Sequence, residues 1–173
     1  KSKSGLVHFR GGTRIAERDT YSFLETLDIA TGTRKVLKEF DYVIEAPNWT
    51  SDGRLLVYNS GGRLYTYELA IGAIKELDTG FAVDCNNDHV LSADNTQIAV
   101  SHFTFEDATS RIYIVPFEGG EPRLVTALGP SYLHGWSPDG QRLAYCAERG
   151  GQYDVYTISA EGGAEVQLTD QPG

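Results

Sequence analysis

The sequence has few of the residues that define a disulfide scaffold, a membrane span or a nucleic-acid-binding surface. It contains only two cysteines, Cys85 and Cys146, which are too few for a disulfide framework, so we expect two buried free thiols. No apolar run approaches the length that spans a bilayer, so no membrane insertion is expected. Lysine and arginine number 15 against 24 aspartates and glutamates. The resulting net charge of −9 repels phosphate, so we expect no nucleic acid partner.

Methionine is absent, even at position 1. The chain opens on Lys1-Ser2-Lys3-Ser4, which has no apolar signal-peptide core. We therefore expect that the natural start is missing and that the chain is a piece of a longer protein. Its 173 residues are nevertheless enough to bury a sizeable core.

One internal repeat runs through most of the chain. Each copy has a short turn that contains an aspartate, followed by an apolar strand. The three aspartates are Asp52, Asp94 and Asp139, spaced roughly 42 to 45 residues apart. Each copy continues with a tyrosine-containing strand, a glycine turn and a short strand that ends in leucine. The apolar residues alternate along each segment, so we expect four short antiparallel strands in each copy and no helix.

The turn before each apolar strand carries a hairpin signal. Asp52-Gly53 and Asp139-Gly140 are the dipeptides that favour a tight type I′ turn, and Asn95 stands at the glycine position in the middle copy. We therefore expect type I′ hairpins at these sites, with the aspartates as turn residues. Trp49 and Trp136 are expected to pack between repeats.

The length and strand count of the repeat predict an all-β fold made of β-propeller blades of four antiparallel strands, with three complete repeats plus a partial one. We assign one β-propeller domain to residues 1–173, as a partial ring. Its blades are expected at residues 1–39 (partial), 40–80, 81–127 and 128–170. Open blades expose apolar faces, so further blades or a second chain are expected to close the ring.

The repeat resembles that of TolB-like β-propeller proteins. The clearest copy is Trp136-Ser137-Pro138-Asp139-Gly140, followed by Tyr156, Gly162-Gly163 and Leu168-Thr169. The resemblance covers roughly residues 40–170. It implies a six-bladed ring of WD-like repeats, bacterial in origin, that is used most often for protein–protein contact. The compartment, bacterial cytoplasm or periplasm, stays open.

Alignment of the turns places Pro47, His89 and His134 at one equivalent position, just upstream of each turn. This position lies on the strand expected to be innermost, so both histidines are expected to face the central channel on adjacent blades. Two neutral imidazoles can bind a divalent metal there, or one can act as a general base. Asp88 and Asn87 could add oxygen ligands or orient the ring. The alternative is a structural histidine bonded to the neighbouring blade.

Three functions are compatible with these residues. The first is a non-enzymatic interaction and scaffold module that binds a protein partner or a small polar ligand at the channel mouth or the loops. The second is a metal-dependent carbohydrate-active enzyme, because oligogalacturonate lyase is similar in architecture, with channel histidines around a metal. The third is the propeller cap of a serine hydrolase, although no Gly-x-Ser-x-Gly motif occurs here. The loop of residues 103–109 is longer than its counterpart at 59–62 and could form a partner contact.

Overall fold

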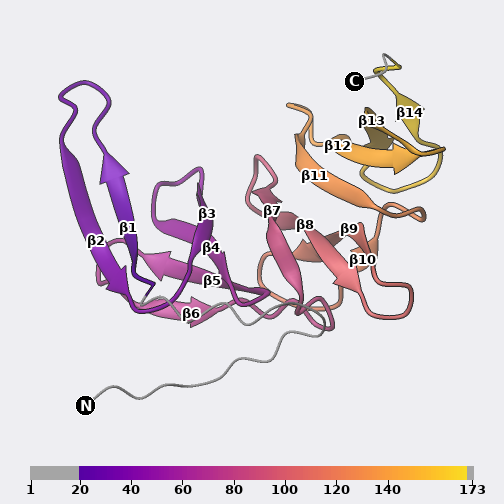
Figure 1. Ribbon diagram of the computed structural model, residues 1–173. Helices are drawn as coiled ribbons and strands as arrows, with labels where there is room; N and C mark the ends of the chain where they lie inside the picture. The colour runs from indigo at the N-terminus through magenta and orange to yellow at the C-terminus, as the bar shows by residue number, and fades with distance from the viewer. Residues whose placement is uncertain (1–19, 171–173) are drawn as a thin grey trace. The chain divides into compact units, whose positions relative to one another are not determined.

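The computed structural model describes residues 20–170, which contain fourteen strands and no helix (Figure 1). The chain divides into two compact units, residues 1–44 and 45–173. The described part of the first unit holds a two-stranded antiparallel sheet of β1 (Ser22–Leu27) and β2 (Arg34–Phe40). The remainder of the partial blade expected at residues 1–39 lies outside the described residues. Within residues 20–170, no helix could cross a membrane.

The second unit consists of three four-stranded antiparallel sheets, each built from strands that are consecutive in the chain. The first sheet contains β3 (Glu45–Trp49), β4 (Leu55–Ser60), β5 (Arg63–Glu68) and β6 (Ile74–Glu76). The second contains β7 (Cys85–Leu91), β8 (Gln97–Thr104), β9 (Thr109–Pro116) and β10 (Arg123–Leu124). The third contains β11 (Ser131–Trp136), β12 (Arg142–Arg149), β13 (Gln152–Ser159) and β14 (Val166–Gln167). This arrangement confirms the predicted all-β class of four-stranded propeller blades.

The middle sheet is buried on both faces, which explains its continuous apolar runs. On β8, Ile98 and Val100 pack toward the first sheet, whereas Ala99 packs toward the third. Tyr113 and Ile114 divide in the same way on β9. Successive side chains of a strand point to opposite faces, so one blade fills two interfaces. The first strands of neighbouring sheets also contact one another, β3 with β7 and β7 with β11.

The Asp-Gly turns differ from the expected type I′ geometry. Only Gly53, Asn95 and Gly140 have positive φ, at 72°, 57° and 69°, whereas the preceding aspartates do not. A type I′ turn needs positive φ at both central residues. The Asp52 carboxylate instead accepts hydrogen bonds from the Thr50 hydroxyl at 2.6 Å and the Arg54 amide at 3.0 Å. The prediction of the turn type was wrong, because these side-chain bonds favour a longer loop in which one residue is left-handed.

The two tryptophans occupy different environments. Trp136 packs against the apolar cluster, and its indole N–H donates to the Val90 carbonyl of the preceding sheet at 2.9 Å. Trp49 is 53% exposed. The sheet that precedes β3 along the chain, β1–β2, belongs to the other unit. Inter-blade packing is therefore confirmed for Trp136 and stays a prediction for Trp49.

The two cysteines are free thiols, as expected, but only Cys85 is fully buried. Burial, followed by the charge of Asp84, raises the pKa of the Cys85 thiol to about 12. The thiol therefore stays protonated near neutral pH and is a poor nucleophile. Cys146 is half-buried, so the expectation of burial holds for one of the two.

Candidate functional site

His89 lies on β7 opposite Val100 and is only 1% exposed. Among the described residues, neither ring nitrogen has a hydrogen bond of good geometry. Burial lowers the pKa of His89 below its ordinary value of 6.5, and the Val57 carbonyl and the Glu45 carboxylate act weakly in the opposite direction. The ring is therefore neutral at pH 7. Its backbone carbonyl accepts a hydrogen bond from the Asn48 side chain of the neighbouring sheet at 2.9 Å.

A β-bulge separates His134 from the position that His89 occupies. On β11, Leu133 pairs with Tyr145 and Gly135 pairs with Ala144, so His134 between them is an extra residue. Leu133 is buried, as His89 is, whereas the His134 side chain is exposed. A bulge turns the side chains beyond it to the other face of the strand. The two histidines are thus at equivalent places in the sequence but not in the sheet.

The other two predicted ligands also lie in a bulge. The pairing of β7 shifts between Cys85 and His89, and the intervening segment contains Asn87 and Asp88. Asn87 is exposed, and Asp88 is held by Asn86 through hydrogen bonds of 2.8 and 2.9 Å. Within residues 20–170 no three His, Cys, Asp or Glu side chains form a group that could hold a metal ion. The metal site at His89 and His134 therefore stays a prediction.

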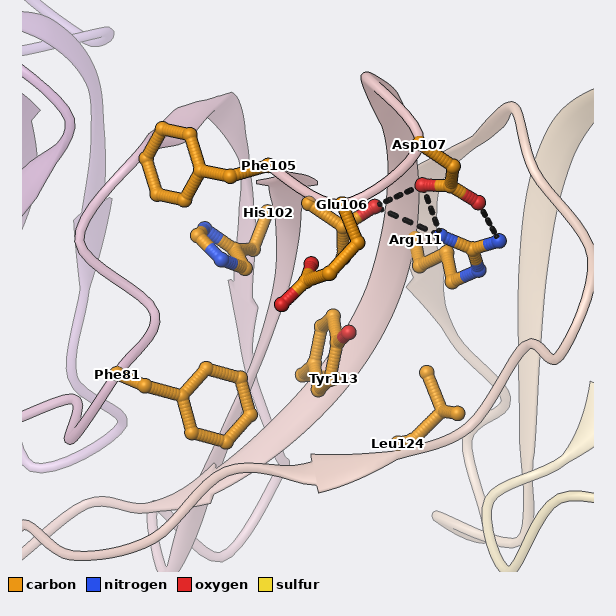
Figure 2. A pocket seen from close by; sticks show the side chains of 9 residues that line it. Phe81, His102, Phe105, Glu106, Asp107, Arg111, Tyr113 and Leu124 are labelled. Atoms are coloured by element: carbon orange, nitrogen blue, oxygen red, sulfur yellow. Dashed lines mark hydrogen bonds and ion pairs between the residues drawn. The ribbon is translucent and has the colours of Figure 1, made fainter.

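A second place in the molecule is hollowed and rich in aromatic side chains. A pocket of about 590 Å³ lies against the middle sheet (Figure 2). It is bordered by Phe81 before β7, His102 on β8, Phe105 in the β8–β9 hairpin and Tyr113 on β9, with Leu124 of β10 at one side. Phe105 is 68% exposed and Phe81 is 51% exposed, so the rim of this pocket is apolar and faces solvent.

The rings of the pocket contact one another. Phe81 and Tyr113 meet edge to face with centroids 5.5 Å apart. His102 lies 5.7 Å from Tyr113, 6.0 Å from Phe81 and 6.1 Å from Phe105. Tilted contacts at these distances are the favourable arrangement for aromatic pairs. The four rings therefore form one cluster, with the buried His102 at its centre.

The charged side chains of the pocket divide into a paired set and an unpaired one. Arg111 forms an ion pair with Asp107, and its Nη1 donates to the Thr104 hydroxyl at 2.7 Å and its Nε to the Ala127 carbonyl at 3.1 Å. The hydrogen bond from Arg111 holds the pKa of Asp107 well below its usual range. Figure 2 shows the Glu106 carboxylate pointing into the space between His102, Phe81 and Tyr113. Glu106 forms no ion pair with any residue that the structure describes.

His102 adds no charge to the pocket at neutral pH. Burial lowers the pKa of the imidazole, and the nearby Asp84 and Glu106 raise it by less. Its Nδ1 accepts a hydrogen bond from the Asp84 amide at 3.3 Å. An accepting Nδ1 belongs to the neutral ring with its proton on Nε2.

Sequence reasoning identified part of this pocket. The sequence predicts a partner contact at the hairpin of residues 103–109 from its length. Phe81, His102 and Tyr113 were not connected with it, because they lie on other strands and loops. The available signal was the alternation along β8 and β9, which places His102 and Tyr113 on the same face of the sheet.

Comparisons with known proteins point to one family. An uncharacterized protein of Agrobacterium fabrum is 43% identical over 153 residues, which is 88% of this chain and 52% of that protein. The Tol-Pal system protein TolB of Francisella tularensis is 30% identical over 128 residues, covering 72% of this chain and 29% of that protein. The chain thus spans about half the length of the first relative and less of the second. No protein-family model matches the chain.

Comparison with solved structures supports the same relationship as the sequence comparisons. The structure of a putative TolB from Agrobacterium tumefaciens has a TM-score of 0.80 at 43% identity, over 84% of this chain and 53% of that one. TolB from Acinetobacter baumannii has a TM-score of 0.77 at 22% identity, over 91% of this chain and 40% of that one. Oligogalacturonate lyase in complex with manganese, at a TM-score of 0.64 and 14% identity, shares the fold alone.

Proposed function

We propose that this chain, which is a TolB-like β-propeller, is part of a non-enzymatic interaction module that binds a protein partner through its loops. The observation that carries this proposal is the exposed aromatic rim formed by Phe81 and Phe105. Aromatic side chains are typical of the centres of protein interfaces, where their burial supplies much of the binding energy. The channel mouth, the other surface expected from the sequence, stays a prediction.

The hairpin that carries Phe105 is longer than its counterparts in the other two four-stranded sheets. The corresponding hairpins of the other two sheets close with the two-residue turns Gly61-Gly62 and Gly150-Gly151, all four glycines having positive φ. The middle sheet has residues 105–108 in the same place, between Thr104 and Thr109. The fold thus accepts a turn without side chains here, which supports a role in recognition for the four residues present.

Site-specific photocrosslinking tests the proposal. A photoreactive phenylalanine at position 105 is expected to give one discrete product with a partner in cells that make the protein. The matched control places the same group at Ile71, which is exposed in the β5–β6 turn away from the pocket.

A second variant tests the same surface without a probe in the hairpin. It replaces residues 105–108 by two glycines and carries the photoreactive residue at position 81. This variant is expected to fold and to lose the product that the probe at position 81 gives in the native hairpin. Identical products from positions 105 and 71, or a product at position 81 that survives the replacement, would contradict the proposal.

A further inference from the structure

The pocket beside the β8–β9 hairpin carries an uncompensated negative charge. Its one cation, Arg111, is engaged with Asp107, Thr104 and the Ala127 carbonyl. This pairing cancels the charge of Asp107, and the bonds of Arg111 occupy four of the five N–H donors of its guanidinium. Glu106 is the remaining charged group and points into the pocket (Figure 2). A carboxylate in this position attracts a cation and repels an anion.

The aromatic rings around Glu106 favour the same kind of ligand. The faces of Phe and Tyr rings attract an ammonium or guanidinium group within about 6 Å of the ring centre. Phe81, Phe105 and Tyr113 approach from the linker before β7, the hairpin and β9, and so border the space on different sides. His102 between them is neutral, because burial lowers its pKa. No group of the pocket therefore opposes a positive charge.

We infer that this pocket binds a lysine or arginine side chain of the protein partner, an inference that rests on the proposed function. The Glu106 carboxylate pairs with the charged head, and the exposed rings of Phe81 and Phe105 cover the alkyl stem. The pocket volume of about 590 Å³ leaves room for part of the partner's backbone as well. The net charge of −9 accelerates the approach of a basic segment at low ionic strength.

Binding of short peptides to the full chain tests this inference. The probes are glycine-flanked peptides with one central lysine, arginine or norleucine, which is an uncharged analogue of lysine. Backbone NMR signals of the hairpin and of residue 81 report occupancy of the pocket. We expect millimolar binding of the two basic peptides that weakens with added salt, and no saturable shift with norleucine.

Two variants locate the binding, each with a control in the same blade. Phe105→Ala is expected to weaken the lysine peptide roughly two- to five-fold, the contribution of one exposed cation–π contact. Glu106→Gln, which keeps the shape of the side chain, is expected to weaken it roughly two- to five-fold as well. Phe103→Ala and Glu118→Gln change exposed residues outside the pocket and should leave the affinity unchanged.

Several outcomes would overturn the inference. If the norleucine peptide bound as tightly as the lysine peptide, the pocket would not select for a positive charge. Unchanged affinity in Glu106→Gln, or the absence of any binding, would remove the basic side chain as the ligand. Binding of free choline as tightly as the lysine peptide would assign the site to small ammonium compounds instead. The photocrosslinking at position 105 tests the proposed function separately. If that crosslink forms while the peptide experiments give any of these results, the inference fails and the proposed function stands.

Discussion

Arg149 provides a quantitative test of how burial determines the value of an ion pair in this fold. Its guanidinium pairs with Glu165 through two contacts of 2.6 and 2.8 Å, and it also donates to the Pro130 carbonyl at 3.0 Å and the Ser131 hydroxyl at 2.9 Å. The side chains of the pair are only 16% and 17% exposed. Arg149 thus links the end of β12 to the start of β11 and to the segment before β14.

The Arg149→Ala substitution leaves the Glu165 carboxylate largely desolvated and without a counter-charge. Breaking a buried pair costs about 3–5 kcal/mol, and breaking an exposed one costs about 0–1 kcal/mol. Because this pair is mostly but not fully buried, we expect a loss of about 2–3 kcal/mol in the free energy of unfolding. The control is Arg63→Ala, since Arg63 and Glu76 are also 2.6 Å apart but are 47% and 48% exposed. It should cost less than about 1 kcal/mol.

Urea unfolding of both variants at pH 7 and at pH 3 provides the measurement. The hydrogen bond from Arg149 holds the pKa of Glu165 below its ordinary value of 4.5. A carboxyl group with a lowered pKa stabilises the fold above its unfolded pKa, and this stabilisation is lost as the pH falls through the folded value. The loss in the free energy of unfolding caused by Arg149→Ala should therefore be smaller at pH 3 than at pH 7. Equal losses for the Arg149 and Arg63 variants, or a deficit that is independent of pH, would refute the reasoning.

The other predictions concern the inner strands. Trp136→Phe removes the indole donor to the carbonyl of the half-buried Val90 and should cost about 1–2 kcal/mol in urea unfolding, whereas the exposed Trp49→Phe should stay within about 0.5 kcal/mol. Equal effects would contradict the packing described for Trp136. Burial lowers the pKa of His89, so the unfolded chain takes up a proton that the folded chain does not, and stability should fall as the pH drops below 6.5. His89→Gln should flatten this slope, and an unchanged slope would rule out the buried neutral ring as its cause. Added manganese or zinc should leave the melting temperature unchanged; a rise that His89→Gln and His134→Gln each abolish would establish the metal site instead.

The sheets could be predicted because their signals are local. Short apolar runs over β4 and β8 and an alternation of two over β12, together with glycine turns at regular spacing, are enough to define a strand and its neighbour. The same local reasoning failed where one extra residue enters a strand. His134 aligns with His89 in the sequence, but the bulge gives its place in the sheet to Leu133. Gly135, beside His134, is a residue type that often marks a bulge, but it does not fix the register, since the bulge depends on pairing with β12.

The pocket could not be predicted for a related reason. Phe81, His102 and Tyr113 belong to a loop and two strands, and only the packing of the sheet places their rings within about 6 Å of one another. The length of the loop at residues 103–109 indicated a partner contact, but nothing in its sequence connected it with Phe81, His102 or Tyr113. The chemistry of the pocket appears only when the hairpin and the sheet are considered together.

The difference between the three hairpins bears on why this pocket exists. Two extra residues in a surface turn add little loop-closure entropy, so the longer hairpin costs the fold almost nothing. Exposing Phe105 to water costs more, because burial of such a side chain stabilises a fold by about 1.5–3 kcal/mol. The glycine turns of the neighbouring blades avoid that cost. Arg111, which pairs with Asp107 and bonds Thr104, then fixes the hairpin over the sheet. An exposed aromatic side chain on a hairpin that the structure holds in place is prepared for a partner, because little of its freedom remains to be lost on binding.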